Sequence, residues 1–444
     1  MNSVTDRAST STGKTPDPQP GSWDVLIAGG GPAGAGAGLY AARKGLKVLI
    51  IDKDEHPRFH IGESMLPQTA WAWRKLGLEG RIQELPHMPK FGGSFALGHE
   101  METEDFQFEN SLVPGDPRSL NIERAPFDQV VLDAAVEAGA TVLRRHRIRK
   151  IQHLEAGRVV LVISPPEGED FTVEGHHLLD ASGQGTLVGH HLQTRRTLPS
   201  FKRVAFYNHY TGIPHREGSK AGNPLIVMCE EGWFWLIAIS PQKTSVGFVT
   251  NSRDAKRLPV AKDRALAYLL ERCPLVHDLT RNAEAPEANM VAADFSYTCR
   301  PYAGPGYFLL GDAATFIDPM FSTGVCMGLM SALEAVDLLI AGRRGKRSMT
   351  SAYRHYDRYI ASSSGVFFDL VHLFYDHAFR EVFLHGRGPV NVQGALTTVL
   401  AGTIYPRMSW AIRWRMELLK TVVRMNRFVP MVPRRPRFSL LDPA

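Results

Sequence analysis

Three glycines with a fixed spacing give the clearest chemical signal in the chain. The stretch GGGPAG at residues 29–34 satisfies G-x-G-x-x-G through Gly29, Gly31 and Gly34. In this pattern the first glycine allows a tight turn, the second lets the backbone approach a pyrophosphate, and the third lets a helix pack on a strand. Free N–H groups at the helix start attract phosphates. Asp52, which ends the next strand, is placed to accept hydrogen bonds from a ribose. The pattern predicts a dinucleotide site.

A second candidate lies far along the chain, in FLLGDAA at residues 308–314. An apolar run there leads into Gly311 and Asp312 and then into a helix, and an acid in that place can bind a ribityl hydroxyl. This arrangement favours FAD over NAD. A plain helix cap is the alternative interpretation of Asp312. The sequence holds no second G-x-G-x-x-G, so no separate nicotinamide domain is expected.

The elements that must hold these residues alternate between strand and helix. Residues 23–29 are an apolar run that leads into the glycine turn, residues 33–43 are alanine-rich and helical, and residues 47–52 are a second apolar run. A strand, a helix and a strand in this order begin a doubly wound parallel sheet. The expected fold class is therefore α/β with a Rossmann-like domain.

A different pattern fills residues 200–250, where short aromatic and β-branched runs are separated by turns, as in an antiparallel sheet. Helical spacing returns over residues 323–340 and 351–383. The expected organisation has four parts. They are a disordered leader (1–22), a discontinuous FAD-binding domain (23–85, 117–199 and 290–345), a substrate-domain sheet (86–116 and 200–289) and a mostly helical, basic C-terminal region (346–444).

Composition excludes several classes of protein. The 444 residues, 44% of them hydrophobic, can bury a large core and are not disordered as a whole. Four separated cysteines without a C-x-x-C pair argue against a disulfide scaffold, and neither they nor the 17 histidines show the spacing of a metal site. A cytoplasmic location fits best. The most apolar stretch, residues 324–342, carries Glu334 and Asp337, so no transmembrane segment is expected.

The basic character is concentrated at the C-terminus. Residues 401–444 hold nine Arg or Lys against two acids, interleaved with Trp410, Trp414 and Phe428. This cluster, which includes Arg434, Arg435 and Arg437, could dock an acidic carrier protein, steer an anionic substrate or be a solvated surface. Nucleic acid is not an expected partner, because no recognition motif accompanies the charge.

Three longer stretches carry a family resemblance. Residues 56–67, HPRFHIGESMLP, resemble the P-R-x-x-x-G-E-S-x-L-P stretch of the flavin-dependent halogenases, within the FAD-binding aromatic hydroxylase-like superfamily. Residues 233–238, WFWLIA, resemble W-x-W-x-I-P, with Ala238 in place of the proline. Residues 311–324, GDAATFIDPMFSTG, are similar to G-D-A-x-x-x-x-D-P-x-x-S-x-G. Phe321, where the tryptophan enzymes carry a glutamate, points to members that act on phenols, pyrroles or carrier-bound aromatics.

The resemblance implies a set of site residues. Arg124, in RAPFD, matches a further cofactor-side position beside the glycines, Asp52 and Asp312. Ser322, Thr323 and Gly324 would bind a halide, and Trp233 and Trp235 would form a wall between flavin and substrate. Two tryptophans at i and i+2 face one side of a strand, where core packing is the alternative.

Lys90 is the catalytic residue that the resemblance implies. It lies in MPKFGGSF, residues 88–95, which is similar to the segment that holds the family's catalytic lysine. A lone lysine is normally solvated. The chemistry requires a compact donor that protonates or captures hypohalous acid, and a desolvated ammonium with a lowered pKa suits that role.

The implied function is FAD-dependent halogenation of an electron-rich aromatic in specialised metabolism. Reduced FAD, supplied by a separate flavin reductase, would react with oxygen to give a hydroperoxide. Chloride or bromide would attack it, and the hypohalous acid would cross to Lys90. An aromatic hydroxylase (monooxygenase) is the main alternative, because Ala238 breaks one motif. A prenyl-lipid reductase and a flavoprotein that only docks a carrier protein are lesser ones.

Overall fold

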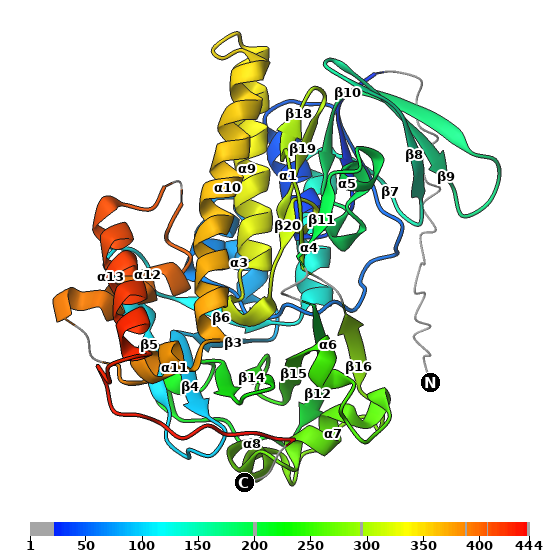
Figure 1. The fold of residues 1–444 in the computed structure, drawn as a ribbon. Helices are drawn as coiled ribbons and strands as arrows, with labels where there is room; N and C mark the ends of the chain where they lie inside the picture. The colour runs from blue at the N-terminus through cyan, green and yellow to red at the C-terminus, as the bar shows by residue number, and fades with distance from the viewer. Residues whose placement is uncertain (1–21, 199–201, 294–295, 387–388, 406, 442–444) are drawn as a thin grey trace, which may run out of the picture.

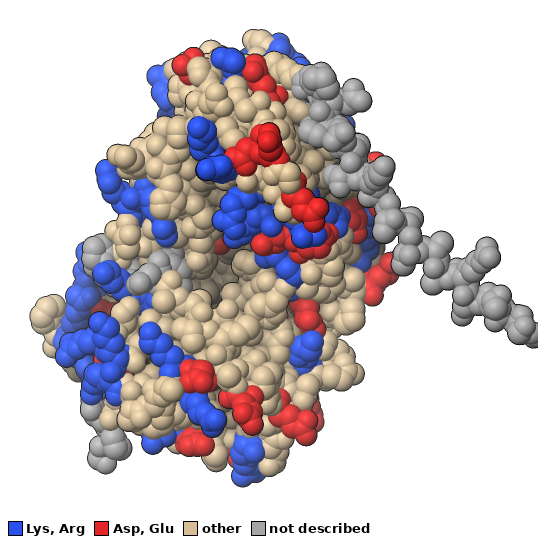
Figure 2. Space-filling model, turned by 90° about the vertical axis from the view of Figure 1, so that its right-hand side faces the viewer, with Lys and Arg blue, Asp and Glu red and all other residues tan. Residues whose placement is uncertain are grey.

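A computed structural model describes residues 22–198, 202–293, 296–386, 389–405 and 407–441 (Figure 1). The expectation of a disordered leader over residues 1–22 therefore lies outside the described residues, except at Ser22. An eight-stranded sheet lies in the upper part of the molecule in Figure 1 and a seven-stranded sheet in the lower part. Figure 2 shows that the surface between these two parts is hollowed.

The eight-stranded sheet has the order β18-β19-β10-β1-β2-β7, with β9 and β8 extending from β10. Its strands are β1 (Trp23–Ala28), β2 (Val48–Ile51), β7 (Thr141–Leu143), β8 (Arg147–Glu155), β9 (Arg158–Ser164), β10 (Phe171–Asp180), β18 (Ala303–Gly304) and β19 (Tyr307–Leu309). The central pairs are parallel, as the apolar runs predict. The α/β fold class is confirmed.

Helices cover this sheet and carry its connections. They are α1 (Pro32–Arg43), α2 (Pro67–Lys75), α3 (Glu79–Gln83), α4 (Arg124–Glu137), α5 (Leu187–His191), α9 (Gly324–Arg343) and α10 (Met349–Phe374). In Figure 1, α9 and α10 run side by side along the height of the molecule. Apolar side chains of α1, α9 and α10 share one buried cluster with the central strands.

The seven-stranded sheet has the order β16-β12-β15-β14-β13-β4-β5. Its strands are β4 (Gly92–Leu97), β5 (Glu104–Gln107), β12 (Arg203–Thr211), β13 (Leu225–Met228), β14 (Gly232–Ala238), β15 (Lys243–Asn251) and β16 (Met290–Ala293). All neighbours are antiparallel except β13 and β4, which are parallel. The expected ranges group β16 with the FAD-binding part, but it pairs with β12 in this second sheet.

The two faces of the second sheet pack against different partners. Phe206, Phe234 and Phe248 form a core with α7 (Ala265–Leu270) and α8 (Pro274–Thr280). Trp233 and Trp235 lie on the opposite face, among apolar side chains of the C-terminal helices. Since side chains alternate between the faces of a strand, Phe234 points away from both tryptophans. The face of the second sheet that carries Trp233 and Trp235 is therefore available to the space between the two sheets.

Short strand pairs, single turns and the C-terminal helices complete the fold. They include β3 (His87–Lys90) with β6 (Ser119–Ile122), the sheet of β11 (Arg195–Thr197), β17 (Tyr297–Cys299) and β20 (Thr315–Phe316), α6 (Ser252–Ala255), α11 (His377–Leu384), α12 (Val392–Leu400) and α13 (Trp410–Asn426). The helical C-terminal region is confirmed. Its last helix buries Ile412, Met416, Leu419 and Val423, whose spacing follows the helical repeat.

Helix α9 is long and apolar enough to cross a membrane, judged by length and composition alone. The two acidic residues that argued against a span in the sequence do not prevent it from passing this test. In the fold, 67% of its most apolar window is buried. The helix packs beside α1 and α10 in the core of the FAD-binding part.

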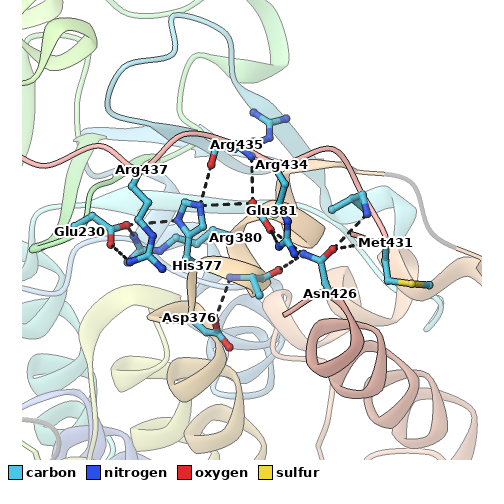
Figure 3. A network of polar contacts seen from close by, with 12 residues as sticks. Glu230, Asp376, His377, Arg380, Glu381, Asn426, Met431, Arg434, Arg435 and Arg437 are labelled. Carbon is cyan, nitrogen blue, oxygen red and sulfur yellow. Dashed lines mark hydrogen bonds and ion pairs between the residues drawn. The ribbon is translucent and has the colours of Figure 1, made fainter. Parts of the chain in front are cut away.

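The segment after α13, which we call the tail (residues 427–441), lies along the second sheet in an extended conformation. It is the red strip that crosses the lower part of Figure 1. Its carbonyl at Phe438 accepts a hydrogen bond from Glu230 N, and Leu440 N donates to Glu231. Figure 3 shows that tail arginines meet acids of the fold. The pairs are Arg434 with Glu381 (2.8 Å), Arg435 with Glu100, and Arg437 with Glu230 (3.1 Å).

These contacts correct the interpretation of the basic tail. Arg434, Arg435 and Arg437 are not simply solvated, because each has an acid within the chain. Docking of an acidic partner by this region stays a prediction. Glu381 is the centre of the network: it is 2% exposed and accepts from Arg434, from Arg435 N and from Asn426. The charges fasten the tail to α11 and to the sheet.

We predict that Glu381→Gln lowers the free energy of unfolding by about 1–3 kcal/mol, because charged hydrogen bonds are lost at a buried acceptor. Burial would raise the pKa of Glu381, but hydrogen bonds from Arg435 N, Arg434 and Asn426 lower it overall. Its contribution is therefore full above its ordinary pKa of 4.5 and is lost as the pH falls through the lowered value.

Urea unfolding at neutral and acidic pH measures both effects. Glu417→Gln is the matched control, since Glu417 pairs with Lys420 on the surface and is 61% exposed. We expect its change to stay within about 1 kcal/mol. Equal losses in the two variants would contradict the central place of Glu381.

Candidate functional site

A cavity of about 800 Å³ is lined by residues of both sheets and of the C-terminal helices. All of the site residues predicted from the sequence line it except Gly34. The structure therefore brings together residues that lie as far apart in the chain as Gly29 and Gly324. Phe367 of α10 and Leu400 of α12 form part of the cavity lining.

Three neighbouring parallel strands, β1, β10 and β19, deliver loops to one end of the cavity. The loop after β1 holds Gly29 and Gly31, and the loop after β19 holds Asp312. The loop after β10, residues 181–185, also lines the cavity, and the sequence interpretation missed it. Crevices at the carboxyl ends of parallel strands are where α/β sheets bind ligands. The run Gly183-Gln184-Gly185 directly after a strand was the available signal.

The glycines of the first loop have different physical roles. Gly29 has φ +101°, and a Cβ there would lie 2.4 Å from the Ala181 carbonyl oxygen. A Cβ at Gly34 would lie 1.9 Å from the carbonyl oxygen of Gly29, so helix and loop need this glycine to pack. At Gly31 the nearest atom is 3.7 Å away, on Arg58. Gly31 caps α1 and keeps backbone open to the cavity, which fits a pyrophosphate beside the free N–H groups of the first turn.

Asp52 is buried directly behind the glycine loop. One carboxylate oxygen accepts from Gly30 N at 2.6 Å and lies 3.1 Å from His56 Nε2, and the other accepts from Asp54 N at 2.9 Å. Burial would raise the pKa of Asp52, but these hydrogen bonds outweigh it and lower the pKa. Asp52 thus holds the loop in place as an anion. Each carboxylate oxygen can accept more than one bond, so ribose binding stays a prediction.

Arg124 is the first residue of α4, and most of its guanidinium N–H groups are already hydrogen-bonded. Its guanidinium forms two hydrogen bonds with Asp128, at 2.8 and 3.0 Å, and donates to the Ile61 carbonyl at 3.1 Å. The motif stretch 56–67, which contains Ile61, is thereby fixed to the FAD-binding part. Contact with the cofactor stays a prediction for Arg124, and the anchoring of this segment is a role that the sequence did not reveal.

Asp312 faces the cavity from the turn after β19. Burial raises the pKa of its carboxyl to about 6, and the positive charge of Arg124 opposes that shift. The N-cap of this turn is Leu310, which forms no side-chain cap bond, so Asp312 is not the cap residue. The carboxyl therefore remains available to a hydroxyl-bearing ligand, as a ribityl chain would require.

The predicted halide residues form the entry to α9. Ser322 has φ +56°, an uncommon left-handed conformation for a residue other than glycine, and Thr323 caps the helix without a side-chain bond. The first N–H groups of a helix have no partner within it and carry partial positive charge. Ser322, Thr323 and Gly324 all line the cavity. The arrangement suits an anion, and halide binding here stays a prediction.

The two tryptophans lie side by side on β14, with ring centroids 5.9 Å apart, and both line the cavity. The Trp235 indole donates to Ser245 Oγ at 3.1 Å, and that of Trp233 donates to the hydroxyl of Tyr375 at 3.0 Å. Tyr375 in turn donates to Asp318 at 2.8 Å. The two tryptophans are therefore tied to Asp318, in the loop that leads to Ser322, Thr323 and Gly324, through a residue at the end of α10. No sequence motif pointed to Tyr375.

Lys90 is 3% exposed, at the end of β3, and reaches the cavity. Its ammonium donates to Ser64 Oγ and to the Met65 carbonyl, both at 2.9 Å, and lies 5.4 Å from the centre of the Phe108 ring. Burial lowers the pKa of Lys90 to about 7. An ammonium has three N–H donors, so one remains for a ligand.

Comparison with known proteins agrees with this geometry. A family model described as an FAD binding domain matches residues 22–362. The flavin-dependent halogenase armH3 of Armillaria mellea is 34% identical over 349 residues, which are 73% of this chain and 69% of that protein. This chain belongs to the flavin-dependent halogenases. The suspected family is confirmed.

Two further halogenases extend the comparison. The 1H-pyrrole-2-carbonyl-[peptidyl-carrier protein] chlorinase of Pseudomonas fluorescens is 26% identical over 375 residues, covering 80% of this chain and 83% of that one. The solved structure of the flavin-dependent brominase Bmp2 has a TM-score of 0.80 and 25% identity, covering 91% of this chain and all of that chain (100%). The match to an FAD binding domain identifies the cofactor of this chain as FAD.

We predict that Gly31→Val leaves the apoprotein folded but abolishes FAD binding, since the added side chain enters open cavity where phosphate must lie. Gly34→Ala is the matched contrast, because its Cβ meets backbone at 1.9 Å and should lower the melting temperature itself. Flavin fluorescence titration and thermal unfolding of the apoproteins separate the two effects. Unchanged FAD affinity in Gly31→Val would remove this loop from the cofactor site.

We predict that Tyr375→Phe lowers stability by about 1–3 kcal/mol, because Trp233 Nε1 and Asp318 lose a buried partner. Burial raises the pKa of Asp318 to about 6, and the Tyr375 hydrogen bond opposes that shift. Without the hydroxyl, Asp318 should bind its proton at a higher pH. Denaturant unfolding and tryptophan fluorescence measure the change, and Tyr268→Phe, on the far face of the second sheet, is the control.

Proposed function

We propose that this flavin-dependent halogenase halogenates an electron-rich aromatic, with Lys90 as the residue that delivers the halogen. The observation that carries the proposal is the buried ammonium of Lys90, which forms no ion pair with any described carboxylate and opens into the cavity that the glycine loop, the halide loop and the tryptophans share. A lysine without a charge partner is costly to bury, so its position needs a functional reason.

Bound reduced FAD, with oxygen and a halide ion, supplies hypohalous acid at its end of the cavity. Trp233 and Trp235 then keep the organic substrate away from the cofactor, and Lys90 donates a proton or hydrogen bond to the hypohalous oxygen. Donation polarises the halogen toward an aromatic carbon. Because the pKa of Lys90 is lowered to about 7, it gives up a proton far more readily than an exposed lysine.

Phenols, pyrroles and carrier-bound aromatics are the proposed substrates. The relative from Pseudomonas fluorescens, named for a pyrrole on a peptidyl carrier protein, supports the carrier-bound form. Names of relatives include a chlorinase and a brominase, so chloride and bromide are both proposed. A separate flavin reductase would supply the reduced cofactor. The four described cysteines are free and buried, which suits a reducing cytoplasm.

Mass spectrometry of products tests the function directly. The enzyme, with reduced FAD, oxygen and either chloride or bromide, is given a panel of phenols, pyrroles and carrier-tethered forms. We expect a halogenated product that disappears when the halide is omitted. A hydroxylated product that forms equally well without halide would identify a hydroxylase instead.

We predict that Lys90→Ala still oxidises reduced FAD and consumes oxygen but loses halogenated product by about a hundredfold or more, as when a positioned acid is removed. Lys90→Arg should not restore it, because guanidinium is bulkier and retains its proton. In the wild type, product per oxygen consumed should fall as the pH rises above about 7, where Lys90 loses its proton.

Lys220→Ala is the control, since Lys220 pairs with Asp105 at the surface and does not line the cavity. Oxygen electrode traces and product yield are recorded together. Product at the wild-type rate in Lys90→Ala would show that another group delivers the halogen.

A further inference from the structure

A second ionisable group faces the cavity and has no part in the chemistry described so far. Glu63 is 2% exposed and lines the cavity. Its Oε1 lies 2.7 Å from Nε2 of His209, whereas its Oε2 is buried without a partner among the described residues. A buried carboxylate oxygen without a donor is rare in proteins, and one that borders a cavity points to a donor on a ligand.

The position of Glu63 is fixed by the segment that holds Lys90. Its neighbours Ser64 and Met65 accept both hydrogen bonds of the Lys90 ammonium. Arg124 holds the same segment through the Ile61 carbonyl. Acid and base are therefore held by the same short segment: Lys90 is the proton donor of the proposed function, and Glu63 offers an open acceptor.

His209 connects this carboxyl with the outside. It lies on β12, its side chain is 18% exposed, and its ring packs 5.4 Å from the ring of Phe59, which is 48% exposed. Tyr207, two residues before His209 on β12, lines the cavity, and burial together with the charge of Glu63 raises its pKa. His60, beside Arg124, is an ionisable group of the same stretch, and burial lowers its pKa to about 4.

We propose that Glu63 is the general base that takes the O–H or N–H proton from the aromatic substrate, and that His209 passes this proton to water. The inference rests on the proposed function. Removal of that proton makes a phenol or pyrrole ring a stronger nucleophile at the moment of halogen transfer. The free Oε2 is the atom that accepts.

The step balances as the conversion of an aromatic C–H and hypohalous acid into an aromatic C–halogen bond and water. The ring carbon bonds to the halogen, the halogen–oxygen bond breaks with its electron pair on oxygen, and that oxygen takes a proton from Lys90 to leave as water. Glu63 receives the O–H or N–H proton. The ring C–H proton returns to the substrate oxygen or nitrogen, and the proton leaving through His209 equals the one that Lys90 regains.

Glu63→Gln tests the base, because the amide keeps the shape and the contact with His209 but cannot take the proton. A series of phenols of increasing acidity is the probe, from one that is neutral at the assay pH to one that is fully ionised. We expect the neutral phenol to react about a hundredfold more slowly than with wild type, while the ionised phenol reacts at nearly the wild-type rate. His209→Asn should show the same dependence on substrate acidity in weaker form.

Two measurements separate this from a structural effect. FAD affinity and the release of hypohalous acid to a small-molecule trap should be unchanged in Glu63→Gln. The matched control is Glu334→Gln, since Glu334 pairs with His355 at 2.9 Å on the outside of α9 and α10 and does not line the cavity. We expect this variant to behave as wild type with every phenol.

The outcomes decide between the proposals. Equal slowing of neutral and ionised phenols by Glu63→Gln, or no slowing of either, would overturn the role of Glu63 as base. Absence of halogenated product from the wild-type enzyme with every phenol would instead contradict the proposed function and leave the acidity comparison without a reaction to measure.

Discussion

A lysine ammonium held out of water is the constraint on which the rest of the structure depends. Removing a cation from water is unfavourable, and a carboxylate beside it would hold its pKa high. Lys90 is instead met by the Ser64 hydroxyl and the Met65 carbonyl, two dipoles that leave burial to dominate its pKa. Arg124, in the first turn of α4, anchors the segment that supplies them through the Ile61 carbonyl.

The two sheets present different chemical groups to the same cavity, polar on one side and apolar on the other. The parallel sheet offers loops, helix starts and the acid Asp312, which suit phosphates, ribityl hydroxyls and an anion. The second sheet offers the flat apolar surface of Trp233 and Trp235, which suits an aromatic. The chain Trp233–Tyr375–Asp318 joins these two surfaces, so that the tryptophans keep their place relative to the loop before α9.

The C-terminal region holds the second sheet and the cavity lining in place. Helices α10 to α13 cover the tryptophan face of the second sheet, and Phe367 and Leu400 close the cavity. The tail then ties α11 to the sheet through a buried acid, Glu381, with three donors. Arg434, Arg435 and Arg437, which the sequence marks only as part of a basic cluster, form ion pairs that attach the tail within the chain. Hydrophobic burial alone would leave the direction of this extended segment undefined, whereas paired charges specify it.

The sequence by itself determined the local chemistry. Gly29, Gly31 and Gly34 predict the loop because their spacing follows from one turn and one helix start, and the i and i+2 spacing of Trp233 and Trp235 places both on one face. Local motifs also indicated the family, and the stretch 88–95 pointed to Lys90. Only the tertiary structure decided what meets across distance. Tyr375 lies 142 residues from its partner Trp233, His209 lies 146 from Glu63, and Arg435 lies 335 from Glu100. Such pairs have no sequence period, because packing of separate elements brings them together. For the same reason the sequence showed basic residues in the tail but could not show that Arg434, Arg435 and Arg437 already had acidic partners.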